Sequence, residues 1–266
     1  MRIVVGVKHV PELVSSRGFT EAGWTRRTAD DSSLNEVDEN AVEAALRVAG
    51  TDGEVIAISL GPAIAVDALR RSLAMGASRA IHLHDDAFAG GDAIATATAL
   101  SAAVRKLEAQ GPVDLVITGL AALDGLGAVV PSLLAAQLDW PQLTVIEELS
   151  AADGVVHGRR ELDGVTEVWR SAAPVVVSVT DLANQARLPK MKDLMAARSA
   201  EITVWSAAEL ALASTDVGSA GSRTRVVSAQ QRPPHPGPVQ VSDDDGGGGA
   251  ALAAYLIEND LLGGVK

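Results

Sequence analysis

The chain has 266 residues, of which 47% are apolar and 21% charged, and its formal net charge at pH 7 is −12. This composition predicts a packed core rather than disorder, and so acidic a chain excludes nucleic acid and disfavours an anionic membrane surface as partners. The absence of cysteine excludes disulfides, thiolate catalysis and cysteine-ligated metal centres. Charged residues interrupt the N-terminal apolar run too early for a signal peptide, and no apolar run approaches the ~20 residues of a membrane span. We therefore expect a cytoplasmic protein without direct membrane insertion.

Strand-like and helix-like stretches alternate along the first 150 residues. Apolar runs typical of buried strands occupy residues 2–8, 54–61, 79–85, 113–119 and 143–149. Helical patterns fall between them at residues 35–49, 62–76, 92–110 and 129–138. Asn35 is the expected N-cap of the first helix. The order βαβαβαβαβ predicts an α/β fold, with a doubly wound, mostly parallel sheet of the Rossmann-like, adenine-nucleotide-binding type.

The pattern changes after residue 150. Alternating residues around a glycine-bearing turn predict a β-hairpin over residues 153–171, which leads into another buried strand. Residues 184–202, here called the basic segment, are amphipathic and positively charged in an otherwise acidic chain. Beyond residue 208 the chain is rich in Pro, Gly and Asp, up to a short amphipathic helix near its end. We expect one domain over residues 1–190, followed by a recognition segment and an extended C-terminal arm over residues 191–266.

A glycine-rich turn follows the fourth predicted strand, at residues 119–131. Residues 125–130 form a partial G-x-G-x-x-G motif with Val130 in place of the third glycine, and Glu147 lies near the interval at which an acid meets a ribose. The turn has no Lys, Arg, Ser or Thr, but main-chain N–H groups at a helix N-terminus can hold an anion unaided. A main-chain phosphate site and an ordinary β–α turn both fit.

No catalytic or metal centre is evident in the sequence. His82 and His84 precede Asp85 and Asp86 and could present ligands to a metal, but a pair of half-exposed polar residues at a strand end explains them better. We predict no metal site. No stretch assembles a nucleophile, a base and an oxyanion hole, so we do not expect an enzyme in its own right.

The basic segment has two open interpretations. Leu188, Met191, Leu194 and Met195 fall at helical spacing, with positive charges around them. This pattern fits a surface helix that rests on its own core. It equally fits an adaptable partner site, because methionine side chains can repack against different surfaces.

Several stretches together resemble the electron transfer flavoprotein beta subunit, from residue 1 to about residue 205. They occur in that family's order and spacing: VGVKHVPE, NEVDENAVEAALR, SLGPAIAVDALRRSLAMGASRAIHL, VDLVITGLAALDG, LDWPQLT and GRRELDGVTEVWRSAAPVVVSVT. The resemblance implies a heterodimer with an alpha subunit that holds most of the FAD. It also implies electron transfer from flavin dehydrogenases, such as the acyl-CoA dehydrogenases of fatty acid oxidation, to a membrane quinone reductase.

The resemblance further implies that this subunit binds AMP as a structural ligand. The residues at the matching positions are Gly6, Asn35, Glu36, Val37, Asp38, Leu60, Gly119, Ala122, Leu123, Asp124, Gly125, Leu126, Gly127, Ala128, Val129 and Val130. Many members carry polar residues in the phosphate turn, often Gln at the place of Val129. The side-chain ligands of the phosphate are therefore missing here, and main-chain N–H groups remain.

Partner contacts are implied by the same resemblance. Leu13 and Glu161 match positions near the flavin and the subunit contact. The basic segment matches the loop that docks onto dehydrogenases, in which Met191 takes the place of the anchoring leucine. The residues expected to bind partners there are Arg187, Leu188, Met191, Leu194 and Met195.

Two other functions share parts of this pattern. A stand-alone adenine-nucleotide-binding module of the stress-protein type would share the sheet, but it would not need the extension after residue 181. A nicotinamide-dependent dehydrogenase would depend on residues 125–130 and on Glu147, and it lacks the fingerprint after the first strand.

Overall fold

The structure is a computed structural model that describes residues 1–12, 15, 18–27, 32–233, 237 and 246–262. The chain divides into two compact units, Met1–Ala229 and Gln230–Lys266. The first unit continues past residue 190, where the sequence placed a boundary, and it includes the basic segment.

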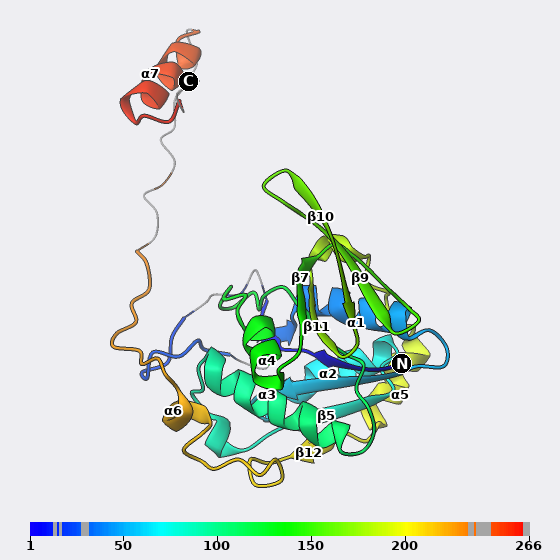
Figure 1. The fold of residues 1–266 in the computed structure, drawn as a ribbon. Coiled ribbons are helices and arrows are strands. Elements are labelled where there is room, and N and C mark those ends of the chain that lie inside the picture. The colour runs from blue at the N-terminus through cyan, green and yellow to red at the C-terminus, as the bar shows by residue number, and fades with distance from the viewer. Residues whose placement is uncertain (13–14, 16–17, 28–31, 234–236, 238–245, 263–266) are drawn as a thin grey trace. The chain divides into compact units, whose positions relative to one another are not determined.

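A seven-stranded parallel sheet forms the centre of the first unit (Figure 1). Its strands are β1 (Arg2–Gly6), β4 (Glu54–Leu60), β5 (Arg79–Leu83), β6 (Leu115–Gly119), β7 (Gln142–Ile146), β11 (Val175–Val179) and β12 (Thr203–Trp205). They lie in the order β12-β5-β4-β1-β6-β11-β7, and every neighbouring pair is parallel. The predicted doubly wound α/β fold is confirmed.

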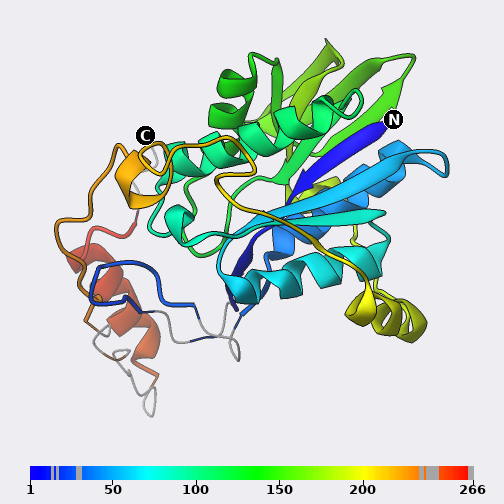
Figure 2. The same ribbon diagram turned by 90° about the horizontal axis from the view of Figure 1, so that it is seen from below.

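Helices cover both faces of this sheet (Figure 2). The helices on one face are α1 (Glu36–Ala49) and α2 (Val66–Met75), and those on the other are α3 (Ala93–Glu108) and α4 (Val130–Leu138). Side chains alternate between the two resulting cores, so Ile3 and Val5 face α1 and α2 while Val4 faces α3 and α4. Strands buried on both faces explain the continuous apolar runs in the sequence.

Two small antiparallel sheets accompany the central one. The first contains β8 (Glu148–Ala152), β9 (Val155–Leu162) and β10 (Val165–Ala172), in the order β10-β9-β8, and β9 with β10 forms the predicted hairpin. The second pairs β2 (His9–Pro11) with β3 (Ser32–Leu34).

One predicted strand is two strands in the structure. Residues 143–149 divide between β7 and β8, which belong to different sheets. Val145 has φ 61°, and its N–H donates to Ser178 Oγ at 3.0 Å instead of continuing the ladder. This interruption lets the chain leave the parallel sheet for the antiparallel one.

Two further α-helices occur among the described residues of the first unit, α5 (Met191–Ser199) and α6 (Gly218–Gly221). Beyond them the chain is tied to the N-terminus of α3 through Asp92. Asp92 Oδ1 accepts the N–H groups of Ile94 and Ala95, which caps the helix, and Oδ2 accepts those of Arg223 and Thr224 at 2.7 and 2.9 Å. One carboxylate therefore fixes both the start of α3 and the point from which the chain continues.

The described residues of the second unit form one helix, α7 (Gly248–Glu258). Leu252, Tyr255 and Ile257 on this helix are exposed. Among the residues that the structure describes, no helix has the length and hydropathy to cross a membrane.

Candidate functional site

The candidate site lies where the carboxyl ends of β1 and β6 meet. The two strands are neighbours, with Gly6 opposite Thr118, but their connections run to opposite faces, to α1 after β1 and to α4 after β6. Such a divergence leaves a crevice at the carboxyl edge of an open α/β sheet, and ligands of these folds bind there. Leu60, at the end of β4 on the other side of β1, comes to the same edge.

Glycine is required at the end of β6. A Cβ on Gly119 would lie 2.5 Å from Asp38 Oδ1 and 2.9 Å from the carbonyl carbon of Val37, so the turn after β6 approaches the first turn of α1 too closely for any side chain. A Cβ on Gly6 would lie 3.2 Å from Thr118 Cγ2, which is a milder restriction.

Asn35 is the N-cap residue of α1, as the sequence predicted, but its side chain makes no capping hydrogen bond. Its Nδ2 donates to the carbonyl oxygen of Ala121 at 3.0 Å, and its Oδ1 accepts the N–H of Leu123 at 3.0 Å. A fully buried amide thus joins the start of α1 to the glycine-rich turn and holds the turn in place. The preference of asparagine for N-cap positions indicated a bond within α1. In the structure, the amide oxygen and nitrogen of Asn35 both bond to the distant turn instead.

Asp38 holds the turn from the same helix. Its Oδ2 accepts the Lys8 N–H at 2.8 Å and its Oδ1 accepts the Gly119 N–H at 3.2 Å. Burial raises the pKa of Asp38 to about 7, although the hydrogen bonds of Lys8 and Gly119 act in the opposite direction. The carboxyl group therefore ties the ends of β1 and β6 to α1. Glu36 is exposed and Val37 half-buried at the start of this helix.

Two positively charged side chains lie at the glycine-rich turn, although the turn itself contains no Lys or Arg. Asp124, whose side chain is 1% exposed, pairs with Lys8 Nζ at 2.8 Å and with Arg27, whose Nε lies 3.0 Å away. Burial acts to raise the pKa of Asp124, but the charges and hydrogen bonds of Lys8 and Arg27 outweigh it and lower that pKa. Lys8 could have been found from its place two residues after β1, the neighbour of β6, but nothing in the sequence indicated Arg27.

The far end of the turn is open. Residues 125–129 are exposed, Leu126 at 68%, and a Cβ on Gly125 or Gly127 would meet no atom within 4 Å. Leu126 and Ala128 have φ of 48° and 51°, the left-handed conformation that non-glycine residues rarely adopt. Val129 is the N-cap of α4 and supplies no side-chain acceptor, so this helix N-terminus is available to an anion. Ala122 and Val130, at either end of the turn, are half-buried.

Ser59, at the same edge, was also not identified from the sequence. Ser59 precedes Leu60 on β4, is fully buried, and its Oγ has no hydrogen-bond partner among the described residues. A buried hydroxyl without a partner is costly, and a polar ligand at the carboxyl edge is one way to satisfy it.

Glu147 is not where a dinucleotide-binding acid would lie. It follows β7 at the edge of the sheet, with β11 between β7 and β6, and its carboxylate lies 3.6 Å from Arg159 Nη1. His82 and His84 stack with ring centroids 5.0 Å apart, and a nitrogen of each lies 3.1 Å from the Gly61 carbonyl oxygen. Within the described part of the chain, no group of three or more potential ligands could hold a metal ion.

The basic segment combines an extended stretch with a short helix. Helix α5 begins only at Met191, so Leu188 lies before it and not on its face. Leu188 is 84% exposed, Met191 73% exposed, and Met195 is exposed as well, but Leu194 is half-buried. The exposed apolar residues therefore differ from the predicted helical stripe in two ways. Leu188 is not on the helix, and Leu194 is not exposed.

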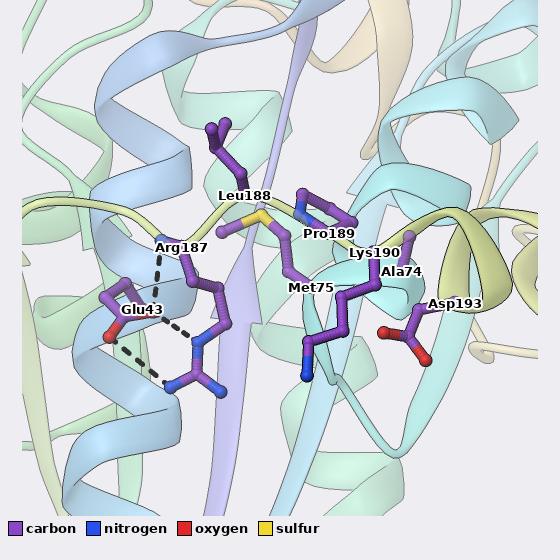
Figure 3. Close-up of a pocket in the computed structure, with 8 residues that line it drawn as sticks. All are labelled: Glu43, Ala74, Met75, Arg187, Leu188, Pro189, Lys190 and Asp193. Atoms are coloured by element: carbon purple, nitrogen blue, oxygen red, sulfur yellow. Dashed lines mark hydrogen bonds and ion pairs between the residues drawn. The ribbon is translucent and has the colours of Figure 1, made fainter.

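Beneath this segment is a cavity of about 490 Å³ (Figure 3). Glu43 and Met75 line it from α1 and α2, and Arg187, Leu188 and Lys190 line it from the segment. Figure 3 shows the Arg187 guanidinium turned toward the Glu43 carboxylate, while Leu188 points away from it.

The hairpin carries the other predicted contact. Glu161 is exposed on β9, with Oε2 3.8 Å from Arg159 Nη2. Arg160 pairs with Glu167 at 2.5 Å and lies over the ring of Trp169, which is exposed on β10. Leu13 lies outside the described residues.

Comparison with known proteins identifies the family. The electron transfer flavoprotein domain model matches residues 24–210. The chain is 37% identical over 248 residues to the electron transfer flavoprotein subunit beta of Mycobacterium tuberculosis, covering 91% of this chain and 92% of that protein. It is 34% identical over 232 residues to protein FixA of Rhizobium meliloti, covering 85% and 80%, and 35% identical over 230 residues to the subunit beta of Thermoanaerobacterium thermosaccharolyticum, covering 86% and 87%. The chain therefore belongs to the electron transfer flavoprotein family and is similar to its beta subunits along nearly its whole length.

Proposed function

We propose that the chain is the beta subunit of a heterodimeric electron transfer flavoprotein, which carries electrons from flavin dehydrogenases, such as acyl-CoA dehydrogenases, to a membrane quinone reductase. FAD, held mainly by an alpha subunit, supplies the redox chemistry when bound. The present chain completes the flavin site and recognises partner proteins. The observation that carries this proposal is the exposed apolar side of the basic segment, Leu188, Met191 and Met195, on a chain whose named relatives are subunits of electron carriers.

The carboxyl edge of the sheet is the proposed site of a structural AMP. Three features support it: the room around Gly125 and Gly127, the N-terminus of α4, and the buried Ser59 hydroxyl at the same edge. Main-chain N–H groups of the turn would hold the phosphate. Lys8 and Arg27 add positive charge beside it, which the sequence of the turn lacks. The turn's shape depends on Asn35 and on the carboxylate of Asp38, not on side chains of its own.

Contacts with the alpha subunit are assigned to the hairpin, through Glu161, and to the C-terminal arm. The arm continues from the point fixed by Asp92, and α7 exposes Leu252, Tyr255 and Ile257. An isolated helix with an exposed apolar side is not stable in water, so we expect the partner subunit to cover α7.

The two rival functions are less well supported. A stand-alone nucleotide-binding module has no use for a segment that exposes Leu188 and Met191. A nicotinamide-dependent dehydrogenase needs an acid near the turn, and Glu147 lies beyond β11.

Leu188 is more exposed than Met191, which the family resemblance implied as the anchor, so we assign the anchor to Leu188. Leu188→Ala in the heterodimer is expected to raise the KM for an acyl-CoA dehydrogenase about 10-fold or more, because truncating an anchor costs roughly 2 kcal/mol. Met191→Ala should have a smaller effect, since Met191 is less exposed and methionine adapts. Steady-state reduction of the heterodimer at varied dehydrogenase concentration measures both. Val204→Ala removes an exposed apolar side chain from β12 and serves as the control. A KM for Leu188→Ala equal to that of the control would remove the docking assignment.

A further inference from the structure

The basic segment is held by side chains of two helices that precede it by more than 100 residues. Glu43 on α1 is 5% exposed at its side chain and accepts from two arginines. Arg187 Nε lies 2.6 Å from Oε2 and Arg187 Nη2 3.3 Å from Oε1 (Figure 3). Arg47 Nε lies 2.6 Å from Oε1. The main-chain N–H of Arg187 also donates to Oε2, at 3.4 Å. One buried carboxylate thus fixes both the side chain and the backbone of the residue before Leu188.

A second attachment lies one helical turn earlier on α1. Asn40 Nδ2 donates to the carbonyl oxygen of Asn184 at 2.7 Å, and Asn184 Nδ2 donates to the carbonyl oxygen of Asn40 at 3.0 Å. Arg47 Nη2 reaches the carbonyl oxygen of Gln185 at 3.3 Å. These bonds replace a backbone ladder, because the segment has no regular secondary structure before α5.

The third attachment is at the end of the segment. Arg70 on α2 donates from Nη1 to the carbonyl oxygen of Ala197 at 2.7 Å, in the last turn of α5. Carbonyl groups at a helix C-terminus have no intrahelical partner, so a guanidinium there stabilises the helix end. Ala197 is also the buried residue of α5.

The residues that project from the segment lie between these attachments. Leu188 follows Arg187 directly, and Pro189 restricts the backbone on its other side. An exposed apolar side chain on a freely moving loop would lose conformational entropy on binding, whereas a fixed loop has already lost it.

We propose that Glu43 is a positioning residue, which together with Asn40 and Arg70 holds the basic segment in the conformation that presents Leu188 to a dehydrogenase. This inference rests on the proposed function. The Glu43 side chain is buried, and it acts through Arg187. Removing its charge loosens the presentation of Leu188 without altering the flavin site.

The test is Glu43→Gln in the intact heterodimer with an acyl-CoA dehydrogenase as the probe partner. The amide keeps the volume but loses the charge that two guanidiniums require. We expect the KM for the dehydrogenase to rise roughly 5- to 10-fold, with kcat and flavin content unchanged. Amide hydrogen exchange of residues 185–195 should accelerate to a similar extent.

Glu39→Gln is the matched control. Glu39 lies one turn before Glu43 on α1 and is ion-paired to Arg71 Nε at 2.8 Å, away from the segment. It should leave the KM and the exchange of residues 185–195 as they are. Should Glu43→Gln not fold, Asn184→Ala removes the bond from Asn184 Nδ2 to the Asn40 carbonyl oxygen, outside the core, and leaves the bond from Asn40 Nδ2 to the main chain. It is expected to act in the same direction, with a smaller effect.

Three outcomes separate this inference from the proposed function. A raised KM with faster exchange in Glu43→Gln, but not in Glu39→Gln, supports the inference. A raised KM in Leu188→Ala with an unchanged KM in Glu43→Gln overturns the inference alone. Unchanged KM values in both Leu188→Ala and Glu43→Gln overturn the proposed docking function and, with it, the role of Glu43.

Discussion

Gly119→Ala is expected to lower the melting temperature of the heterodimer by several degrees and to release the AMP that we propose for this site. The added Cβ would lie 2.5 Å from Asp38 Oδ1 and 2.9 Å from the carbonyl carbon of Val37. Neither can move freely, because Asp38 is buried and hydrogen-bonded to two strand ends and Val37 belongs to α1. Overpacking of this kind costs about 1–3 kcal/mol, and each kcal/mol shifts the melting temperature of a domain this size by roughly 2–4 °C.

Gly125→Ala is the control for that substitution. It lies in the same turn, but a Cβ there would meet no atom within 4 Å. Differential scanning calorimetry of both variants, together with the nucleotide content of the purified protein, separates the two positions. Equal melting temperatures for Gly119→Ala and Gly125→Ala would mean that the turn and α1 are not in the close contact described here.

Asp38→Asn is expected to remove a pH dependence of stability between about pH 4 and pH 7. The pKa of Asp38 is raised from its ordinary 3.8 to about 7, chiefly by burial. Between pH 4 and pH 7 the carboxyl group of Asp38 keeps its proton in the folded state but has lost it in the unfolded state. The fold therefore has the full contribution of this carboxyl group to its stability only below pH 4. Its contribution is lost as the pH rises through 7. Each unit of pKa difference corresponds to ~1.4 kcal/mol, so the whole change amounts to several kcal/mol.

The variant keeps an acceptor oxygen but cannot ionise. We therefore expect the melting temperature of Asp38→Asn, measured relative to the parent, to improve steadily as the pH is raised from 4.5 to 7.5 and then to level off. Thermal melts of parent and variant at matched pH values measure this difference. Parallel curves across the range would contradict the burial of an ionisable group at this position.

Much of the fold could be predicted from the sequence, because the central parallel strands β1, β4, β6 and β11 are continuous apolar runs and helices α1 to α4 lie between strands at the predicted places. The short edge strand β12 (Thr203–Trp205) carries no such run and was not predicted. What could not be predicted depends on contacts between distant residues. The strand at residues 143–149 looks continuous, and only the bond from Val145 to Ser178 Oγ reveals that it divides. The insertion of β11 between β6 and β7 likewise has no local signal, and it removes Glu147 from the turn.

The candidate site shows the same limit. The sequence located the glycine-rich turn and Asn35, but Asn35 has an ordinary N-cap signature and its actual bonds go to Ala121 and Leu123. The turn looked free of positive charge because Lys8 and Arg27 are remote in the chain. In the basic segment, helical spacing suggested a stripe that includes Leu188, yet the helix begins three residues later, at Met191.

The most direct test is to purify the chain with its alpha subunit, denature the complex and identify the released ligands by mass. The account predicts a yellow heterodimer that releases one FAD and one AMP, and a colourless product when this chain is expressed alone. A monomer of this chain that holds FAD tightly without a partner, or a stable heterodimer that releases no flavin, would contradict it.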